Sequence, residues 1–481
     1  MRVADDGYRP CIGVEVHAQI VTDSKLFCSC RNEFGAPPNT NICPVCCGLP
    51  GVLPVTNRRA VEQVVKTGLA LGCQVAKQSH FARKAYYYPD MPKNFQISQY
   101  ESERLTYGGH LDLLVNGETV RIRIRRVHLE EDTAKSVHTP DGGSLVDYNR
   151  AGVPLMEIVT EPDFTSSEQV RVCLHTLRDI LRYLGASDAQ MEEGKMRAEP
   201  TVNLRHDETG EGTPIAEIKN LASVKVVCDA VDYEVRRQTR ALEAGEPMHR
   251  ETRRWDEARQ VTIPMRSKET SGDYRYFPEP DLVPMAMDEA WVQRLAAQLP
   301  EPPHLRCRRF VTQYGLPEYD AQLLTVTRAT ADFYEEAARL HGDAKAVSNW
   351  MMGDFAKLLN DRGIPIEASC VTPGHLAQML DLIREGKITG KIAKELFERM
   401  FVSGEAPGEI VAREGLVVMS DSAELAAVVA QVLAESQDAV AKFQGGEQKV
   451  KGFLVGQVMA ATKGKADPKL VNRLLDEKLA G

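Results

Sequence analysis

Four cysteines within one nineteen-residue window near the start of the chain constrain its fold more than any other feature. They are spaced as Cys28-x-Cys30 and Cys43-x-x-Cys46. Two close thiolate pairs joined by a short loop can converge on one tetrahedral Zn²⁺, and four thiolates leave no position for a substrate. The spacing therefore predicts a structural zinc site; the alternative is a set of unrelated buried thiols. Cys47 directly follows Cys46, so either could be the fourth ligand.

The remaining cysteines show no pairing pattern. Of eleven in total, seven are scattered outside the quartet: Cys11, Cys47, Cys73, Cys173, Cys228, Cys307 and Cys370. An odd count, with no apolar run at the amino terminus, fits a reducing cytosol and not a disulfide framework. No segment approaches the ~20 apolar residues needed to cross a bilayer. We therefore expect a cytoplasmic protein with no membrane association.

Length and charge limit the organisation and the partners of the chain. A length of 481 residues is too great for one core and predicts about two to four domains. The net charge of -9 argues against a surface that binds nucleic acid throughout. From Lys442 to the end, however, eight lysines and arginines stand against four acidic residues, a local balance of +4. No G-x-x-x-x-G-K-[ST] loop is present, so nucleotide chemistry would need another kind of site.

The apolar pattern predicts a β-rich part followed by a helical part. Roughly the first 290 residues read as strands with interrupting helices, and the remainder reads as almost wholly helical. The proline-rich segment 299–303 resembles a linker, and residues 403–408 form a second break. We therefore predict an α+β chain with domains at 1–295, 296–405 and 406–481, and the zinc loop 28–46 in the first.

The first predicted strand, residues 11–20, has one apolar and one polar face. With the two-residue period of a strand, three aliphatic side chains share one face and three polar side chains share the other: Ile12, Val14 and Val16 against Glu15, His17 and Gln19. An acid, an imidazole and an amide in a row suggest the floor of a polar cavity. A solvent-exposed sheet face explains this strand equally well.

A hairpin is predicted further along the chain. Apolar residues alternate on both sides of Asn116-Gly117, which is the strongest short hairpin signal. Its second strand contains Ile122 and Ile124. A helix is predicted over residues 166–185, with a capping box at its start and a glycine at its end.

After Ile124, the second strand of this hairpin continues with polar residues. The alternation predicts Arg126, His128 and Glu130 on the same face as Ile122 and Ile124. The next residue, at position 131, is a glutamate predicted to point the other way. A histidine and carboxylates on neighbouring strands suit a site for Mg²⁺ or Mn²⁺. The alternative is a carboxylate run that ends a strand in solvent.

Two further segments carry polar residues at irregular spacing. Residues 81–101 hold Lys84 and Lys93 on either side of Asp90, among prolines and tyrosines that suit a rigid loop. A surface loop over packed tyrosines explains this segment as well. Residues 146–162 hold Arg150 and Glu157 in a strand-like segment, where ion pairing could account for the charges.

Long motifs in the same order closely resemble the B subunits of bacterial aspartyl/glutamyl-tRNA amidotransferases. The motifs are GVEVHAQI, KLFCSC, PNTNICPVC, GLPGVLPV, RKAYYYPDMPK, QISQYE, HLEEDTAK, VDYNRAGVPLMEIVTEPD, RSKETSGDYRYFPEPDL and GFLVGQVMAATKGKADPKLVNRLL. The resemblance covers nearly the whole chain. It implies a large β-rich, cradle-like catalytic domain, an all-helical connecting domain and a small helical tail domain.

The resemblance also implies an activity. In this family, the A subunit frees ammonia from glutamine and the C subunit is a small stabilising partner. The B subunit uses ATP to phosphorylate the side-chain carboxylate of misacylated Glu-tRNA(Gln) or Asp-tRNA(Asn), and ammonia then displaces phosphate. Such an enzyme is a ligase with glutamine as amido donor. Which of the two mischarged tRNAs is used depends on the synthetases of the host.

Site residues follow from the resemblance, position by position. The Mg²⁺ site of the family falls on Glu15, His17 and Glu130, with ATP bound there. The positions of Lys84 and Lys93 match residues of the hydrophilic ammonia path. Three further residues match the pocket: Arg150, Glu157 and Arg275.

Zinc and tRNA sites follow in the same way. Family members that keep the four cysteines bind structural Zn²⁺ there. The tail matches a module that touches the outer corner of tRNA, where Lys451, Lys463 and Lys465 would contact phosphates without base specificity. The alternative for the tail is a solvated helix end.

The chain departs from the family pattern in two places. The family motif EGS-x-R-C-D is replaced by EGKMRAE at 193–199, and KNLNSF is replaced by KNLASV at 219–224. Lys195 and Glu199 change reach and charge near the expected pocket.

Two other interpretations of the chain compete with this family. One is the archaeal paralogue, which carries a large extra domain that this length cannot hold, and the other is a non-catalytic zinc-containing tRNA-binding protein.

Overall fold

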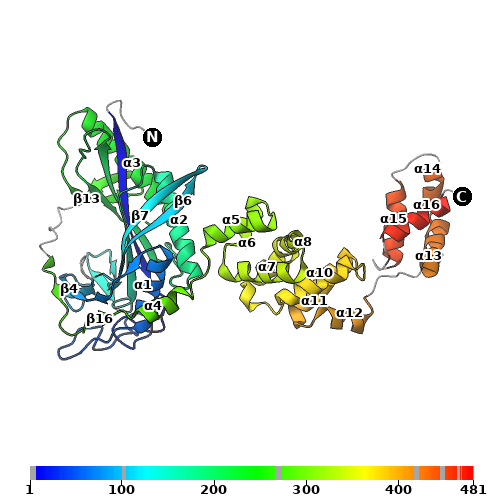
Figure 1. The fold of residues 1–481 in the computed structure, drawn as a ribbon, viewed down its shortest axis with the longest axis horizontal. Helices are drawn as coiled ribbons and strands as arrows, with labels where there is room; N and C mark the ends of the chain where they lie inside the picture. The colour runs from blue at the N-terminus through cyan, green and yellow to red at the C-terminus, as the bar shows by residue number, and fades with distance from the viewer. Residues whose placement is uncertain are drawn as a thin grey trace. The chain divides into compact units, whose positions relative to one another are not determined.

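The computed structural model describes residues 7–99, 104–265, 274–416, 422–444, 450–462, 466 and 468–479. Its contacts divide the chain into two compact units, Met1–Pro302 and Pro303–Gly481 (Figure 1). The first unit is built on a large sheet, and the elements in the described residues of the second are helices. Among the described helices, none is long and apolar enough to span a bilayer.

Within the described residues, the first unit is built on a nine-stranded sheet in the order β14-β13-β12-β11-β1-β10-β7-β6-β2. The strands are β1 (Tyr8–Gln19), β2 (Gln74–Val75), β6 (Thr106–Val115), β7 (Glu118–Glu131), β10 (Pro154–Thr160), β11 (Met196–His206), β12 (Ala216–Lys219), β13 (Glu251–Asp256) and β14 (Val261–Pro264). Neighbouring strands are antiparallel except for the parallel pair β12 and β13. The long strand β1 therefore lies at the centre, between β11 and β10.

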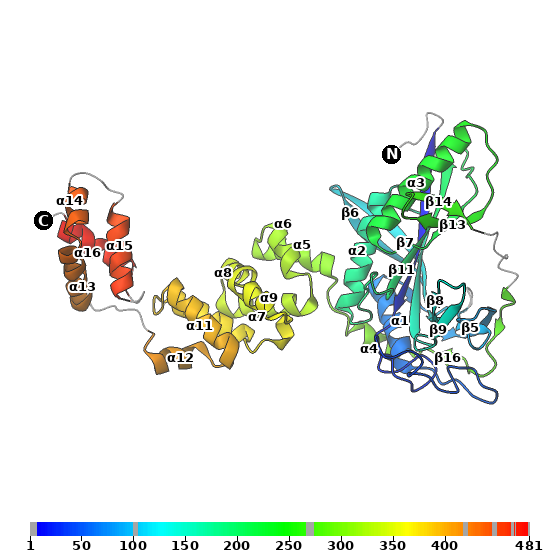
Figure 2. The ribbon, with the colours of Figure 1, turned by 180° about the vertical axis from the view of Figure 1, so that it is seen from behind.

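Three helices cover the apolar face of this sheet: α1 (Arg58–Ala70), α2 (Ser167–Tyr183) and α3 (Val224–Glu243). They contact β7, β6 and β11 respectively (Figures 1 and 2). The predicted alternation on β1 is confirmed, because Ile12, Val14 and Val16 are buried in the core beneath the helices. The side chain of Ser166 caps α2 by accepting from the Gln169 amide, as the capping-box pattern predicted.

The predicted hairpin is confirmed and joins β6 to β7. Asn116 and Gly117 both have positive φ, 51° and 85°, which a two-residue turn of this kind requires.

The alternation on β7 breaks once, and this corrects a prediction. Ile124 and Val127 are buried in the same core, although an unbroken strand would put them on opposite faces. The register against β10 shifts here, from Val159 opposite Arg126 to Thr160 opposite Ile124. A β-bulge thus changes the phase of the strand. Arg126 and the polar residues that alternate after it lie on the face opposite Val127, so the prediction that they share the face of Ile124 was wrong.

Smaller sheets lie beside the large one. A three-stranded sheet contains β15 (Phe277–Pro278), β4 (Ala82–Ala85) and β5 (Phe95–Ser98) in that order. Two two-stranded sheets pair β3 (Gln78–Ser79) with β16 (Met285–Ala286), and β8 (Lys135–His138) with β9 (Ser144–Asp147). The amide of Ile97 on β5 donates to Glu131 Oε1 at 2.8 Å. The three-stranded sheet is thereby held against the end of β7. Helix α4 (Glu289–Ala296) ends the described elements of this unit.

The second unit contains two separate hydrophobic cores. The first is built from α5 (Pro303–Tyr314), α6 (Glu318–Leu324), α7 (Arg328–His341), α8 (Ala344–Trp350), the π-helix η2 (Met351–Phe355), α9 (Ala356–Arg362), the 3₁₀ helix η3 (Ile366–Ala368), α10 (Pro373–Arg384), α11 (Gly390–Ser403) and α12 (Pro407–Glu414). The second is built from α13 (Ser422–Glu435), α14 (Gln437–Gln444), α15 (Val450–Ala461) and α16 (Pro468–Leu479). The predicted fold class, a β-rich domain followed by helices, is confirmed. The domain limits at 295 and 405 stay predictions.

Candidate active site

The polar face of the large sheet carries three rows of aligned side chains on its central strands. Residues paired across antiparallel strands point to the same face. The first row runs from β11 to β7 as Arg197, His17, Glu157 and His128; the second is Glu199, Glu15, Val159 and Arg126; the third is Gln19, Leu155 and Glu130. Four strands from distant parts of the sequence thus contribute to one polar surface.

His17, Glu130 and Glu157 form the tightest group on this surface. Nε2 of His17 lies 3.5 Å from Glu130 Oε1 and 3.3 Å from Glu157 Oε2. One ligand atom from each residue can be chosen so that all three lie within 4.8 Å of one another, as a shared metal ion requires. The sequence had assigned Glu15 to this group, whereas Glu157, assigned only to the pocket, occupies the position beside His17.

A second layer of side chains holds the two glutamates. Nη2 of Arg126 lies 3.2 Å from Glu157 Oε1, and Nε2 of His128 lies 3.5 Å from Glu157 Oε2. The hydroxyl of Ser98 donates to Glu130 Oε2 at 3.3 Å. Arg126 and His128 were not among the site residues that the family resemblance implied, and Ser98 had no predicted role. The alternation on β7 placed the first two near Glu130, but the link from β5 through Ser98 had no sequence signal.

The charges of the group follow from its burial and its neighbours. Burial lowers the pKa of His17, but the hydrogen bond and charge of Glu157 and the charge of Glu130 outweigh it and raise the pKa to about 9. Burial lowers the pKa of His128 to about 4. Burial and the nearby Glu157 raise the pKa of Glu130. For Glu157, the neighbouring cations and the hydrogen bond from His17 outweigh burial and lower the pKa. The carboxylates of Glu130 and Glu157 therefore favour a positive charge between them and His17.

Glu15 lies one row away from the group, paired across the sheet with Glu199 of β11. Burial and the charge of Glu157 raise the pKa of Glu15 to about 7. The departure at Glu199 is accommodated by an ion pair with Lys219, whose Nζ also lies 2.6 Å from Glu217 Oε1. The carboxylates at this end of the sheet are thus partly neutralised by Lys219.

Lys195, the second change of charge within residues 193–199, forms ion pairs outside the group. Nζ of Lys195 lies 3.0 Å from Asp188 Oδ2 and 2.9 Å from Glu193 Oε2. These two ion pairs hold the side chain of Lys195 against acidic residues of its own loop.

Lys84 on β4 faces the group from the three-stranded sheet. Burial lowers its pKa, but the charges of Glu130 and of nearby tyrosines outweigh burial and raise it. Its Nζ lies 4.9 Å from the ring centroid of Tyr274. Arg275, which follows, has φ 44°, in the left-handed region that non-glycine residues rarely adopt. Its side chain makes no ion pair or hydrogen bond with the described residues, so its pocket role stays a prediction.

Lys93 points away from the group and pairs with Glu131 instead. Its Nζ lies 2.6 Å from Glu131 Oε2, and both side chains are largely buried. They line a cavity of about 280 Å³ between the cysteine loop and the three-stranded sheet. Arg83 and Glu279 form a further ion pair on its wall, at 2.7 Å. Lys84 and Lys93, which the sequence grouped together, therefore face different sides of the three-stranded sheet.

Arg150 belongs to a network around Asp132 at the end of β7. Asp132 Oδ2 accepts from Gln19 Nε2 at 2.8 Å, and its Oδ1 lies 3.1 Å from Arg197 Nη2. Arg150 Nε lies 3.6 Å from Asp132 Oδ2 and donates to the Thr133 carbonyl at 2.8 Å. Burial raises the pKa of Asp132, but the two guanidinium groups outweigh burial and lower it. The network joins β1, β7 and β11 at the edge of the polar surface.

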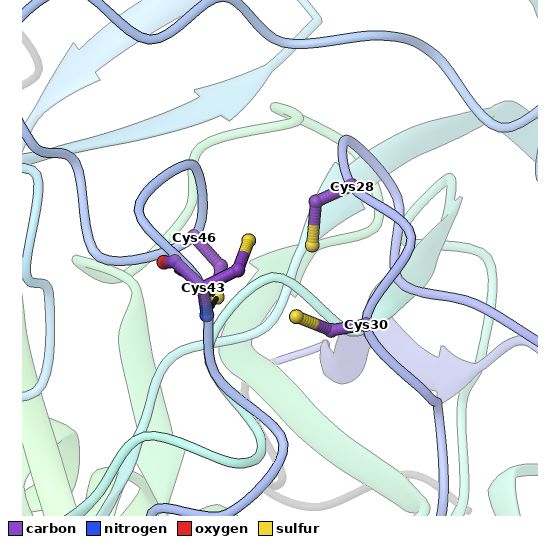
Figure 3. Close-up of side chains that lie close together, drawn as sticks. All are labelled: Cys28, Cys30, Cys43 and Cys46. Atoms are coloured by element: carbon purple, nitrogen blue, oxygen red, sulfur yellow. Dashed lines mark hydrogen bonds between the residues drawn. The ribbon is translucent and has the colours of Figure 1, made fainter.

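The four cysteines of the predicted zinc loop converge (Figure 3). One sulfur atom from each of Cys28, Cys30, Cys43 and Cys46 lies within 4.8 Å of the others. The amide of Cys43 donates to Cys46 Sγ at 3.2 Å, as backbone amides do around metal-bound thiolates. The donor set fits Zn²⁺. Cys46, and not Cys47, completes the group.

One of the three predicted tRNA-binding lysines is described. Lys451 on α15 pairs with Asp476 on α16, with 2.6 Å between Nζ and Oδ1. Lys463 and Lys465 lie outside the described residues.

Comparison with known proteins identifies the class. A family model described as the GatB/GatE catalytic domain matches residues 10–293, which contain both the carboxylate group and the cysteine loop. A second model, the GatB domain, matches residues 332–479. Together they describe a catalytic subunit with a helical carboxyl-terminal region.

Curated relatives narrow this class to one family. Proteins named as the B subunit of aspartyl/glutamyl-tRNA(Asn/Gln) amidotransferase from Moorella thermoacetica and Caldanaerobacter subterraneus are 51% and 50% identical to this chain, over 98% of its length and 100% and 99% of theirs. The protein of that name from Carboxydothermus hydrogenoformans is 49% identical over 98% of this chain and 99% of its own length. The chain belongs to the family of aspartyl/glutamyl-tRNA(Asn/Gln) amidotransferase B subunits, so the family predicted from the motifs is confirmed.

Proposed function

We propose that this chain amidates the side-chain carboxylate of the amino acid on misacylated Glu-tRNA(Gln), Asp-tRNA(Asn) or both. The observation that carries the proposal is the group of His17, Glu130 and Glu157, which lies within the residues that match a catalytic-domain model. A non-catalytic tRNA-binding protein has no use for two buried carboxylates around an imidazole, because burying charge is costly without a partner.

The reaction proceeds in two steps. The carboxylate oxygen attacks the γ-phosphorus of ATP, which gives an acyl phosphate and ADP. Ammonia then attacks the acyl carbon and phosphate leaves, which gives the amide. A carboxylate is a poor acceptor for ammonia because it lacks a leaving group, and the acyl phosphate provides one.

A divalent cation, Mg²⁺ or Mn²⁺, fits the group. Two carboxylates and an imidazole suit these ions, and the buried Nδ1 of His17 has no hydrogen-bond partner in the described structure. We propose Glu130, Glu157 and His17 as its ligands, with Glu15 as a neighbouring residue. When bound, the ion neutralises phosphate oxygens and the charge that develops during phosphoryl transfer. Around it, Arg126 and Ser98 orient the two carboxylates.

Four other predicted residues take surrounding roles in this proposal. Lys84 faces the group and attracts the negative charge of the phosphorylated carboxylate. Lys93 lines the cavity beside the cysteine loop, which we propose as the path by which ammonia arrives. Arg150 shapes the edge of the polar surface through Asp132. Arg275 is proposed as a pocket residue from its place beside Tyr274.

The proposed partners follow from the relatives' names, which describe one subunit of a larger enzyme. We infer a complex with an amidase or glutaminase, the A subunit, which supplies ammonia, and with a small C subunit. An enzyme that modifies aminoacyl-tRNA for protein synthesis works in the cytoplasm. The four-cysteine loop holds structural Zn²⁺ in this proposal and takes no part in the reaction.

The helical tail is proposed to bind tRNA. Lys451, Lys463 and Lys465 supply positive charge for phosphate contacts, although Lys451 must then exchange its bond to Asp476. Truncation after residue 416, at the end of the first helical core, is expected to weaken tRNA binding and to reduce its salt dependence. Unchanged affinity in a filter-binding titration against salt would contradict this role.

The experiment that tests the function uses the chain co-expressed with its two partner proteins. The purified complex is incubated with glutamine, ATP and one mischarged tRNA at a time, and the amino acid released from the tRNA is identified. We expect conversion of glutamate to glutamine, aspartate to asparagine, or both, only when ATP is present. Binding of tRNA without any ATP-dependent conversion would support the non-catalytic alternative instead.

A further inference from the structure

Lys25 is a lysine without exposed surface. Its relative accessibility is 0%, and it is one of the largest fully buried side chains of the described structure. The residue lies at the start of the segment that leads into Cys28, and its amide donates to the Cys30 carbonyl at 2.9 Å. Lysine is almost never fully buried unless it is paired. The positive charge of Lys25 therefore requires a partner inside the protein.

The ammonium group of Lys25 has two polar contacts. Its Nζ lies 3.7 Å from Cys46 Sγ and donates to the Tyr148 carbonyl at 3.2 Å. Among the described residues, no carboxylate lies within ion-pair distance of Lys25. A carbonyl satisfies a hydrogen bond but supplies no net negative charge, and a buried ammonium without a counter-charge is costly. The remaining candidate for the counter-charge is the group of cysteine sulfurs.

The charge of a four-thiolate zinc site matches this need. Four thiolates and one Zn²⁺ carry a net charge of -2, and Cys46, the cysteine that Lys25 contacts, is the buried one of the four. We propose that Lys25 is the counter-ion of the metal site: its ammonium donates to the Cys46 thiolate and offsets part of the negative charge when the ion is bound. The proposal rests on zinc binding by the four cysteines, which is part of the proposed function.

The same lysine connects the metal loop to the strands of the active site. A Cβ placed on Gly152 would lie 3.6 Å from Lys25 Cδ, 3.7 Å from Cys46 Cβ and 3.7 Å from Glu131 Oε2. Gly152 has φ 84° and its carbonyl accepts from the Leu26 amide at 2.8 Å. The stem of Lys25 therefore packs on the backbone of the loop that leads into β10, while its charged end reaches the metal site.

Zinc affinity of the intact complex tests the proposal. Wild type and Lys25→Met are titrated with a chromophoric chelator, which reports the zinc dissociation constant without reference to catalysis. Methionine keeps the length and apolar stem of lysine and removes the charge. We expect zinc to bind about 10- to 100-fold more weakly in Lys25→Met, the range seen when a partner of a metal ligand is lost. Lys225→Met, on an exposed lysine paired with Asp229 on α3, is the matched control and should bind zinc as wild type does.

The possible results distinguish the role of Lys25 from the existence of the zinc site. Equal zinc affinity in wild type and Lys25→Met would overturn the role of Lys25 and leave the zinc site intact. Absence of zinc from the wild-type protein would overturn the site itself. If Lys25→Met does not fold, Lys25→Gln is measured in its place, because its shorter neutral side chain also removes the charge.

A change in the ligand charge gives an independent test. Cys30→His replaces a thiolate by a neutral imidazole, so the zinc site then carries a net charge of about -1. A counter-ion matters less to a less charged site. The loss of affinity caused by Lys25→Met should therefore shrink in the Cys30→His protein, and an unchanged loss would show that Lys25 acts by packing alone. Co²⁺ substitution adds a spectroscopic readout, because loss of a hydrogen bond to Cys46 sulfur shifts the sulfur-to-cobalt charge-transfer band.

Discussion

The cysteine loop and the carboxylate group are two candidate metal sites built in opposite ways. The loop draws all four sulfurs from residues 28–46, and its donors are of one kind. The carboxylate group draws His17, Glu130 and Glu157 from three strands far apart in the sequence, and its donors are mixed. A closed site of four thiolates stabilises a loop, whereas a mixed site with three protein ligands leaves room for a substrate. The kind and the arrangement of the ligands therefore distinguish a candidate structural metal site from a candidate catalytic one.

Removing one cysteine should have the largest effect, and the effect should fall on stability. Cys28→Ser is expected to lose the metal and more than about 4 kcal/mol of unfolding free energy, because loss of a metal is among the most destabilising single changes. The turnover number of the protein that remains folded should change little. Elemental analysis and chemical unfolding measure the two parts, and Cys370→Ser, at an exposed cysteine, is the control. A folded, metal-free variant of wild-type stability would contradict the bracing role.

Removing one carboxylate should affect chemistry instead. Glu130→Gln is expected to lower ATP-dependent amidation about a thousandfold, which corresponds to about 4 kcal/mol of transition-state stabilisation. Its thermal unfolding and the glutaminase activity of the partner should stay near wild type. Glu118→Gln, an exposed residue at the start of the same strand, is the matched control. Normal amidation by Glu130→Gln would reject its assignment as a metal ligand.

The polar surface should also carry a pH-dependent part of the stability, through the carboxylate of Asp132. Because Arg197 and Arg150 hold the pKa of Asp132 below its usual value, its contribution is present above the unfolded pKa of about 3.9 and is lost as the pH falls through the folded pKa. Asp132→Asn should therefore cost about 3 kcal/mol at pH 7, and the difference from wild type should shrink below about pH 4. Urea unfolding at several pH values measures it. The exposed pair of Asp112 and Arg121 offers Asp112→Asn as a control, expected to cost less than about 1 kcal/mol.

Glu15→Gln should have the smallest effect of the four. The residue lies one row away from the group, so we expect a loss of amidation of about tenfold, or about 1.4 kcal/mol. Steady-state rates of Glu15→Gln and Glu157→Gln, measured side by side, rank the two positions. A loss in Glu15→Gln as large as in Glu157→Gln would place Glu15 among the ligands, as the family motif indicated.

The difference between the two sites also explains what the sequence could predict. The cysteine loop was visible in full, because its ligands are neighbours in the chain; the remaining choice, Cys46 against Cys47, was resolved by the direction of one side chain. The polar face of β1 was predicted correctly from the two-residue period. Local periodicity cannot report which strands pair, so it gave no means of choosing Glu157 over Glu15.

Two other features escaped the sequence for physical reasons. The bulge between Ile124 and Val127 changes which alternate side chains of β7 are buried. In the sequence it is marked only by a break in the alternation of apolar and polar residues. The arginines in this strand would explain such a break without a bulge. The different surroundings of Lys84 and Lys93 depend on which side of the three-stranded sheet each faces. Both depend on tertiary pairing, which the local sequence does not encode.

The place of β1 at the centre of the large sheet has a consequence for synthesis. As the ribosome releases the chain, the cysteine loop is complete once residue 46 has emerged, and it can bind its ion at that point. The carboxylate group needs β10 paired with both β1 and β7, so it cannot form before Thr160 has emerged, and β11 joins the other edge of β1 only after His206. Before β10 emerges, both edges of β1 are unpaired. We therefore expect the unfinished chain to be prone to aggregation through these edges, and a cysteine loop closed early by a metal ion would leave less of the chain free to misfold.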